Sequence, residues 1–116
     1  MSMDAVLSIE IQEGAVAGTR IIRLQGPLTL RNIFTFQGEV RGAALTSRVI
    51  LDLSGVPYMD SAGMGSIINY YVHCENNKTR LIAAGVSPRV MELFKMTKVD
   101  SVIPLAFSVE AAESAA

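Results

Sequence analysis

Residues 48–53, with the sequence Arg-Val-Ile-Leu-Asp-Leu, form a nearly unbroken apolar run that starts with β-branched side chains. A half-buried strand alternates apolar and polar residues, whereas a strand covered on both faces is apolar almost throughout. The sequence Ser-Gly-Val-Pro at 54–57 then breaks the run. The run therefore predicts a buried strand in a sheet that has helices packed on it.

The patterns on either side of this strand alternate between the strand period and the helix period. Further strands are predicted at 7–12, 19–25, 79–84 and 101–105, and helices at 33–44, 61–75, 88–94 and 107–116. Residues 14–18 turn the first two strands into a hairpin, and Pro104 puts the last strand at an edge because proline cannot donate to a ladder. We expect an α/β fold: an N-terminal β-hairpin, then alternating strands and helices, with helices packed on a mixed sheet.

The helical period also predicts which side chains face the sheet. The inward face of the helix at 61–75 is predicted to consist of Met64, Ile67, Ile68, Tyr71 and Cys74. Phe34 and Tyr70 fall outside the inward stripes of their helices, so they are expected at the surface, either as ordinary exposed aromatics or as part of a partner surface. Asn32 is expected to cap the helix that follows it.

The composition excludes several classes of protein. The length of 116 residues predicts a single domain over 1–116, and 50% hydrophobic residues supply a core. A net charge of -1 leaves no concentrated basic surface for nucleic acid. One Cys and one His allow neither an internal disulfide nor a cysteine-rich zinc site, so we expect no metal and no cofactor.

The chain shows no targeting or membrane signal. Its first six residues lack the basic and apolar regions of a secretory signal, and no stretch of about 18 apolar residues occurs. We therefore expect a cytoplasmic protein with no direct membrane insertion.

Standard catalytic signatures are also missing. No phosphate loop occurs, and His73, the one His, follows Ser61 by twelve residues on the same predicted helix. At about 1.5 Å per residue the two lie about 18 Å apart, too far for His73 to act as the general base of Ser61. A hydrolase or transferase that uses Asp60 and Ser61 is disfavoured for lack of a base, so the chain is not expected to be an enzyme.

The segment 58–65, Tyr-Met-Asp-Ser-Ala-Gly-Met-Gly, joins the buried strand to the next helix. Ser61 is therefore expected at a helix N-terminus, where free N–H groups and the helix dipole favour an anion such as a phosphate. Asp60 is an acidic neighbour that can orient the hydroxyl or disfavour a second negative charge; alternatively it is a turn residue or itself the cap. Glycines at 63 and 65 either leave the first turn bare for a partner or allow close packing against the sheet. From spacing alone, a helix cap is the commoner role of such a serine.

Three blocks of the chain carry a family resemblance: Val-Ile-Leu-Asp-Leu-Ser-Gly-Val at 49–56, the segment 58–65, and Ser-Pro-Arg-Val at 87–90 with Leu93 and Phe94. In these blocks the chain resembles the STAS family, specifically the bacterial anti-sigma factor antagonists. The resemblance implies a STAS-like fold and makes Ser61 the phosphoacceptor of an anti-sigma factor serine kinase, which binds the ATP itself. Binding of that kinase frees a sigma factor, and phosphorylation ends the binding. The resemblance also allows a serine phosphatase as a second partner.

The predicted site surrounds Ser61 on two loops. The neighbours of the phosphosite are Asp60, Ala62 and Gly63, and the predicted partner-binding residues are Leu28, Thr29, Tyr58, Met59, Met64 and Gly65. Two departures from the family stand out: Gly-Pro-Leu-Thr at 26–29 lacks the acids of the usual Gly-Glu-Leu-Asp, and Ala62 replaces a frequent Ser or Thr. The alternative function is an accessory STAS subunit of a membrane ABC transporter, which docks on an ATPase without turnover of Ser61.

Overall fold

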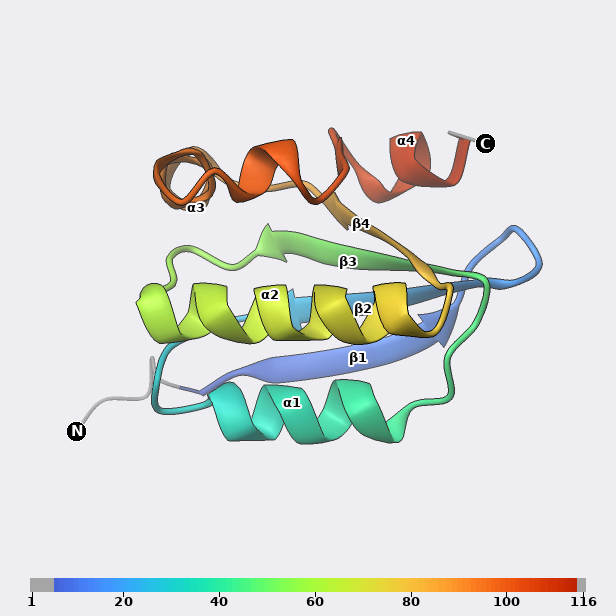
Figure 1. Cartoon of the computed structure of the whole chain (residues 1–116), viewed down its shortest axis with the longest axis horizontal. Helices are drawn as coiled ribbons and strands as arrows, with labels where there is room; N and C mark the ends of the chain where they lie inside the picture. The colour runs from blue at the N-terminus through green and yellow to red at the C-terminus, as the bar shows by residue number, and fades with distance from the viewer. Residues whose placement is uncertain (1–5, 115–116) are drawn as a thin grey trace.

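The structure of the chain, a computed structural model, describes residues 6–114. One five-stranded sheet runs through the molecule in the order β1-β2-β3-β4-β5 (Figure 1). Its strands are β1 (Ser8–Glu13), β2 (Thr19–Gln25), β3 (Arg48–Gly55), β4 (Arg80–Ala84) and β5 (Leu105–Ala106). β1 pairs antiparallel with β2, and every other neighbouring pair is parallel. The predicted α/β fold with an N-terminal hairpin and a mixed sheet is therefore confirmed.

Helices cover both faces of this sheet. They are α1 (Ile33–Gly42), α2 (Ser61–Asn76), α3 (Pro88–Met96) and α4 (Val109–Ser114). Side chains of α1, α2 and α3 share one core cluster with Leu51 and Leu81, whereas α4 packs on the opposite face against Ile21, Ile50 and Ile82. Successive residues of a strand point to opposite faces, so the apolar run in β3 fills both layers, as its sequence predicts.

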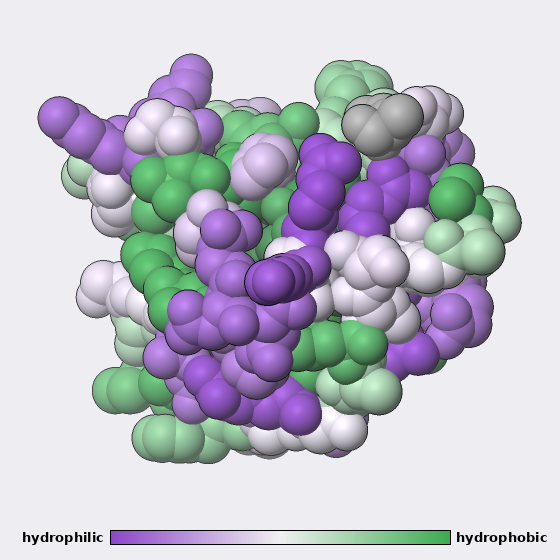
Figure 2. All heavy atoms as spheres, turned by 45° about the vertical axis from the view of Figure 1, so that its right-hand side comes forward, coloured by the Kyte–Doolittle hydropathy of each residue, from purple (hydrophilic) through white to green (hydrophobic). Residues whose placement is uncertain are grey.

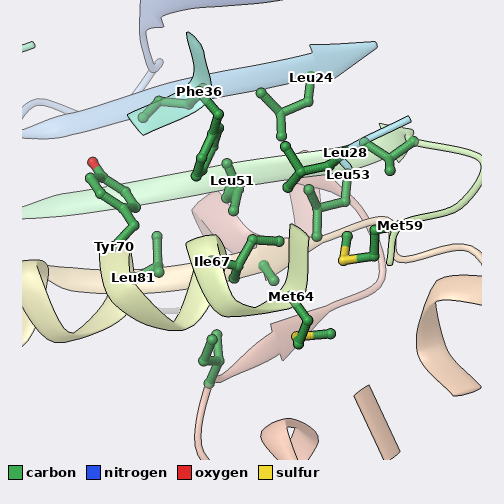
Figure 3. Packing of buried hydrophobic residues seen from close by; sticks show 14 of the residues in the cluster. Leu24, Leu28, Phe36, Leu51, Leu53, Met59, Met64, Ile67, Tyr70 and Leu81 are labelled. Atoms are coloured by element: carbon green, nitrogen blue, oxygen red, sulfur yellow. The ribbon is translucent and has the colours of Figure 1, made fainter. Parts of the chain in front are cut away.

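The larger core lies between α1, α2 and the sheet (Figure 3). Tyr70 is buried there, and its ring meets that of Phe36 edge-on with centroids 6.3 Å apart. The prediction that Tyr70 lies at the surface is wrong, because α2 is covered by α1 as well as by the sheet. The buried face of α2 is thus rotated relative to the predicted one. As a result Ile68, which was expected to face the sheet, is 38% exposed. Phe34 is exposed, as expected.

The region after α3 differs from the prediction. The expected strand at 101–105 is replaced by a 3₁₀ turn, Val99–Ser101, and the two-residue strand β5. Val99 and Ile103 are buried, so their apolar pattern reflects packing on the core and not a strand. β5 does lie at the sheet edge, and the carbonyl of Pro104 accepts a hydrogen bond from Ala83 N (2.9 Å).

The last helix is shorter than expected. It begins after Ser108, whose hydroxyl accepts a hydrogen bond from Ala111 N at 3.1 Å, and Phe107 stays outside it with 93% of its surface exposed. The helix was predicted to begin at 107 from the apolar pattern alone. The cap at Ser108 makes it begin at Val109 instead. Residues 115–116, which the prediction included, lie outside the described part of the chain.

Asn32 occupies the position before α1, as predicted, but its side chain reaches back into the preceding loop. It accepts a hydrogen bond from Thr29 N (2.9 Å) and donates one to Pro27 O (2.7 Å). Asn32 therefore fixes the shape of the loop that leads from β2 to α1, which is one of the two loops at the predicted site.

In residues 6–114, no helix has both the length and the apolar character needed to cross a membrane. The face seen in Figure 2 is mixed in character: hydrophilic side chains gather over its centre, and apolar side chains form separate patches around them.

Candidate functional site

The loops after β2 and β3 meet at the carboxyl ends of these strands. Leu28 and Met59 form an isolated parallel bridge beyond the ends of the strands. Leu28 N donates to Tyr58 O at 3.2 Å, and Asp60 N donates to Leu28 O at 3.3 Å. The pairing of β2 with β3 is thus resumed after both strands end, and it holds the two loops of the predicted site against each other.

The carboxylate of Asp60 joins these loops to α2. Its Oδ1 accepts a hydrogen bond from Gly63 N (2.8 Å), and its Oδ2 accepts one from Leu30 N (3.1 Å). Asp60 is therefore the N-cap of α2, and Ser61 is the first helical residue, so the cap is not Ser61. Both carboxylate oxygens bind amides, so Asp60 positions the backbone and does not orient the hydroxyl of Ser61.

Ser61 is exposed, and its hydroxyl makes no hydrogen bond within residues 6–114. The amides of Ser61 and Ala62 also lack an acceptor among the described residues, because the first turn of a helix has no preceding carbonyls. Two free N–H groups and the positive end of the helix dipole thus lie beside an accessible nucleophilic oxygen. This arrangement can stabilise a group of negative charge on Ser61.

Comparison with known proteins shows the family of this chain. A family model described as the STAS domain matches residues 7–112. The chain belongs to the STAS domain family.

Two curated relatives are anti-sigma factor antagonists by name. One, BtrV of Bordetella bronchiseptica, is 28% identical over 102 residues, which cover 86% of this chain and 88% of that protein. The other, the anti-sigma-B factor antagonist of Listeria monocytogenes, is 31% identical over 55 residues. That match spans about half of either protein, 47% of this chain and 48% of the relative.

Three solved structures share the fold. An anti-sigma factor antagonist from Mycobacterium paratuberculosis superposes with a TM-score of 0.87 at 15% identity, covering 99% of this chain and 97% of that one. The antagonist SpoIIAA in its unphosphorylated form gives 0.72 at 22% identity, with 91% and 94% covered. A sulfate transporter family protein from Wolinella succinogenes gives 0.77 at 20% identity, with 86% and 85% covered.

Three predicted partner-binding residues of this STAS domain are core residues. Leu28 is 0% exposed, Met64 2% and Met59 9%, and all three lie in the cluster between the helices and the sheet (Figure 3). Their side chains point inward because the bridge between Leu28 and Met59 extends the sheet, and Met64 faces it from α2. Their assignment to a partner surface is therefore corrected: they support the loops and are not accessible to a partner.

The other predicted residues remain near the surface. Thr29, Tyr58 and Ala62 are half-buried, and Gly65 is exposed. The guanidinium of Arg89, at the start of α3, lies 5.1 Å from the centre of the Tyr58 ring, which fixes the ring at the edge of the site.

Leu30 belongs to the predicted partner loop at 26–31 but is not among the predicted partner-binding residues. Its amide binds Asp60, and its side chain is 63% exposed beside the start of α2. Phe34 follows one turn of chain later and is 74% exposed. In the sequence, Leu30 is visible only as an apolar residue between Thr29 and Arg31 in the loop after the hairpin. The hydrogen bond from its amide to Asp60 is what brings it to the site.

A second polar cluster lies at the end of β3. Arg23 Nε donates to Asp52 Oδ2 at 2.9 Å, and Ser54 donates to Asp52 Oδ1 from its amide and its hydroxyl. Burial raises the pKa of Asp52, but the hydrogen bonds from Arg23 and Ser54 outweigh it and hold the pKa below its usual value. Asp52 is therefore a weak base, and its contacts are those of a structural ion pair.

Cys74 is another candidate nucleophile. Burial raises the pKa of the Cys74 thiol, so it stays protonated in the core. No three His, Cys, Asp or Glu side chains gather as metal ligands in residues 6–114.

The two glycines of the first turn of α2 provide a test of this geometry. A Cβ on Gly63 would collide with the carbonyl of Leu28 and approach Met59 Cβ to 3.1 Å, whereas a Cβ on Gly65 would meet nothing within 4 Å. We expect Gly63→Ala to lower the free energy of unfolding by about 1–3 kcal/mol through overpacking. Gly65→Ala should raise it by up to about 1 kcal/mol, because alanine favours a helix.

Urea unfolding of both variants measures this difference. Equal effects of the two substitutions would contradict the close approach of Gly63 to the Leu28 loop.

Proposed function

We propose that this STAS domain is an anti-sigma factor antagonist, which binds an anti-sigma factor serine kinase and is released when that kinase phosphorylates Ser61. The observation that carries the proposal is the exposed hydroxyl of Ser61 next to two free amides at the start of α2. The names of the relatives from Bordetella and Listeria support it. The structurally similar antagonist SpoIIAA, described in its unphosphorylated form, supports it as well.

The chemistry needs only an accessible acceptor from this chain. Ser61 Oγ attacks the γ-phosphorus of ATP held by the kinase, its proton is lost, and ADP leaves. A base and a metal ion on the partner serve this step, so the proposal makes this chain a substrate and not an enzyme. A partner kinase that uses ATP implies a cytoplasmic location, which is part of the proposal.

The phosphate meets opposing electrostatic effects of similar size. The free amides of Ser61 and Ala62 and the helix dipole favour an anion, at about 0.3–1 kcal/mol for each exposed interaction. The carboxylate of Asp60 repels it by a comparable amount across solvent. The formal charge of the chain changes from -1 to about -3, so the main effect is new charge at the surface and not a change of fold.

The partner surface in this proposal comprises Leu30, Phe34, Thr29, Tyr58 and Gly65. Leu30 and Phe34 supply exposed apolar area, and Gly65 lets a partner approach the backbone of α2. A phosphate on Ser61 puts about two charges beside this apolar area, where their desolvation opposes binding. Release then follows without rearrangement of the sheet.

A second candidate is an accessory STAS subunit of a membrane ABC transporter. The similarity to the Wolinella sulfate transporter family protein is compatible with a role beside a transporter. Such a subunit docks on an ATPase, and Ser61 accepts no phosphate. The two candidates therefore differ in one observable, phosphate transfer to Ser61.

Incubation with purified anti-sigma factor kinase from the same organism and ATP should add one phosphate, which peptide mass mapping should place on Ser61. Ser61→Ala should accept none and stay bound to the kinase, and Ser61→Asp should bind weakly. Phosphate on Thr29 or Ser66 would contradict the assignment. Absence of transfer with an active kinase would favour the transporter candidate.

Leu30→Ser and Phe34→Ser should each weaken binding of the kinase about 5- to 30-fold, because exposed anchors contribute about 1–2 kcal/mol to an interface. The free energy of unfolding should change by less than about 0.5 kcal/mol, since both side chains are exposed. Calorimetric titration measures the affinity.

Val72→Ser is the matched control for the two substitutions. Val72 is an apolar residue that is 48% exposed, and it lies on α2 eleven residues after Ser61, about 16 Å away along the helix. If Leu30→Ser, Phe34→Ser and Val72→Ser weaken binding of the kinase equally, the interface is not centred on Leu30 and Phe34.

A further inference from the structure

α4 has little apolar contact with the sheet face on which it packs. It spans six residues, of which only Val109 and Ala112 are buried. Helices of this length do not persist in water by themselves, because too few hydrogen bonds offset the cost of nucleation. Other contacts must therefore keep α4 on the sheet.

Arg48 supplies the first of these contacts. It is 9% exposed, at the start of β3, and its guanidinium donates to Ala112 O (3.1 Å) and Glu113 O (3.3 Å). Its Nε also donates to Thr19 Oγ1 at 3.1 Å. The last carbonyls of a helix lack partners within the helix, so a cation at this point both caps α4 and complements its dipole.

Glu113 supplies the second contact. Its Oε2 accepts hydrogen bonds from Ala15 N (2.7 Å) and Val16 N (3.3 Å) in the loop between β1 and β2. Gly14 makes room for it, since a Cβ there would lie 2.6 Å from the same oxygen. One side chain at the end of α4 thus satisfies two backbone donors of a loop 97 and 98 positions away in the sequence.

The surface beneath α4 is apolar. Ile21, Ile50, Ile82 and Ala84, from three neighbouring strands, form one cluster with Val109 and Ala112. This face lies opposite the layer of α1 and α2 in the sheet, so its cover does not depend on Ser61 or the loops around it.

We propose that α4 is a strap that opens and closes as a unit separate from the sheet, turns about Phe107 and Ser108, and is held shut by Arg48 and Glu113. Its few buried residues make its release less costly than unfolding of the core, which is the condition for a separate opening. In the open state the strap bares the aliphatic face of Ile21, Ile50 and Ile82. The domain then has a second conformational state, independent of phosphorylation.

Hydrogen exchange followed by NMR on the full chain tests this strap. In the unmodified protein, the amide of Ala112, which donates to Ser108 O at 2.9 Å, should exchange at least about tenfold faster than the amides of Ile50 and Leu51 in β3. Equal protection in α4 and β3 would overturn the proposal, because α4 would then open only with the whole molecule.

Two substitutions in α4 distinguish the effect of the Glu113 hydrogen bonds from the effect of replacing an acidic residue by alanine in the helix. Glu113→Ala should speed exchange at Ala112 and Ala15 about tenfold further and leave β3 unchanged. Glu110→Ala, at an exposed position of the first turn, should change exchange less than about twofold.

Helix dipole effects alone predict the opposite order of exchange rates in the two variants. An acid stabilises the first turn of a helix and destabilises the last, so without the contact Glu110→Ala would loosen α4 and Glu113→Ala would tighten it. Faster exchange in Glu110→Ala than in Glu113→Ala would therefore overturn the role of Glu113. If Glu113→Ala fails to fold, the comparison of α4 with β3 in the unmodified protein still decides the proposal.

Discussion

The two hydrogen bonds of the Asp60 carboxylate determine the geometry on which the candidate site depends. Oδ1 caps α2 through Gly63 N, and Oδ2 holds the loop after β2 through Leu30 N. With both oxygens occupied, the first amides of α2 stay free and Ser61 points to solvent. Gly63 allows this approach because any side chain there would collide with the carbonyl of Leu28. The exposed hydroxyl of Ser61, the proposed phosphoacceptor, is thus held at a rigid helix end.

Local patterns in the sequence were sufficient to predict the order of the elements and the position of Ser61. The apolar run of β3 and the Ser-Pro start of α3 are local signals, and both are confirmed. Predictions that needed long-range packing failed. Tyr70 is buried because α1 covers α2, and Leu28 and Met59 point inward because a bridge forms between two loops that sequence periodicity treats separately. Leu30 was not among the predicted partner-binding residues for the same reason, since its place at the site depends on a contact with Asp60, 30 residues away.

The two faces of the sheet are held in different ways. The layer of α1 and α2 rests on large buried side chains such as Phe36 and Tyr70, so it is not expected to move when Ser61 gains a charge. The opposite face is covered by α4, which depends on polar contacts from Arg48 and Glu113. The proposed switch at Ser61 would therefore act through surface charge, whereas any conformational change is expected on the side of α4.

The most direct test of this account is amide hydrogen exchange in Asp60→Ala, which removes both hydrogen bonds of the carboxylate. A cap worth about 1 kcal/mol predicts that the amides of Leu30 and Gly63 exchange about fivefold faster or more, while those of Ile50 and Leu51 in β3 keep their rates. Faster exchange at Gly63 with no change at Leu30 would contradict the account, because Asp60 would then cap α2 without holding the loop that completes the site.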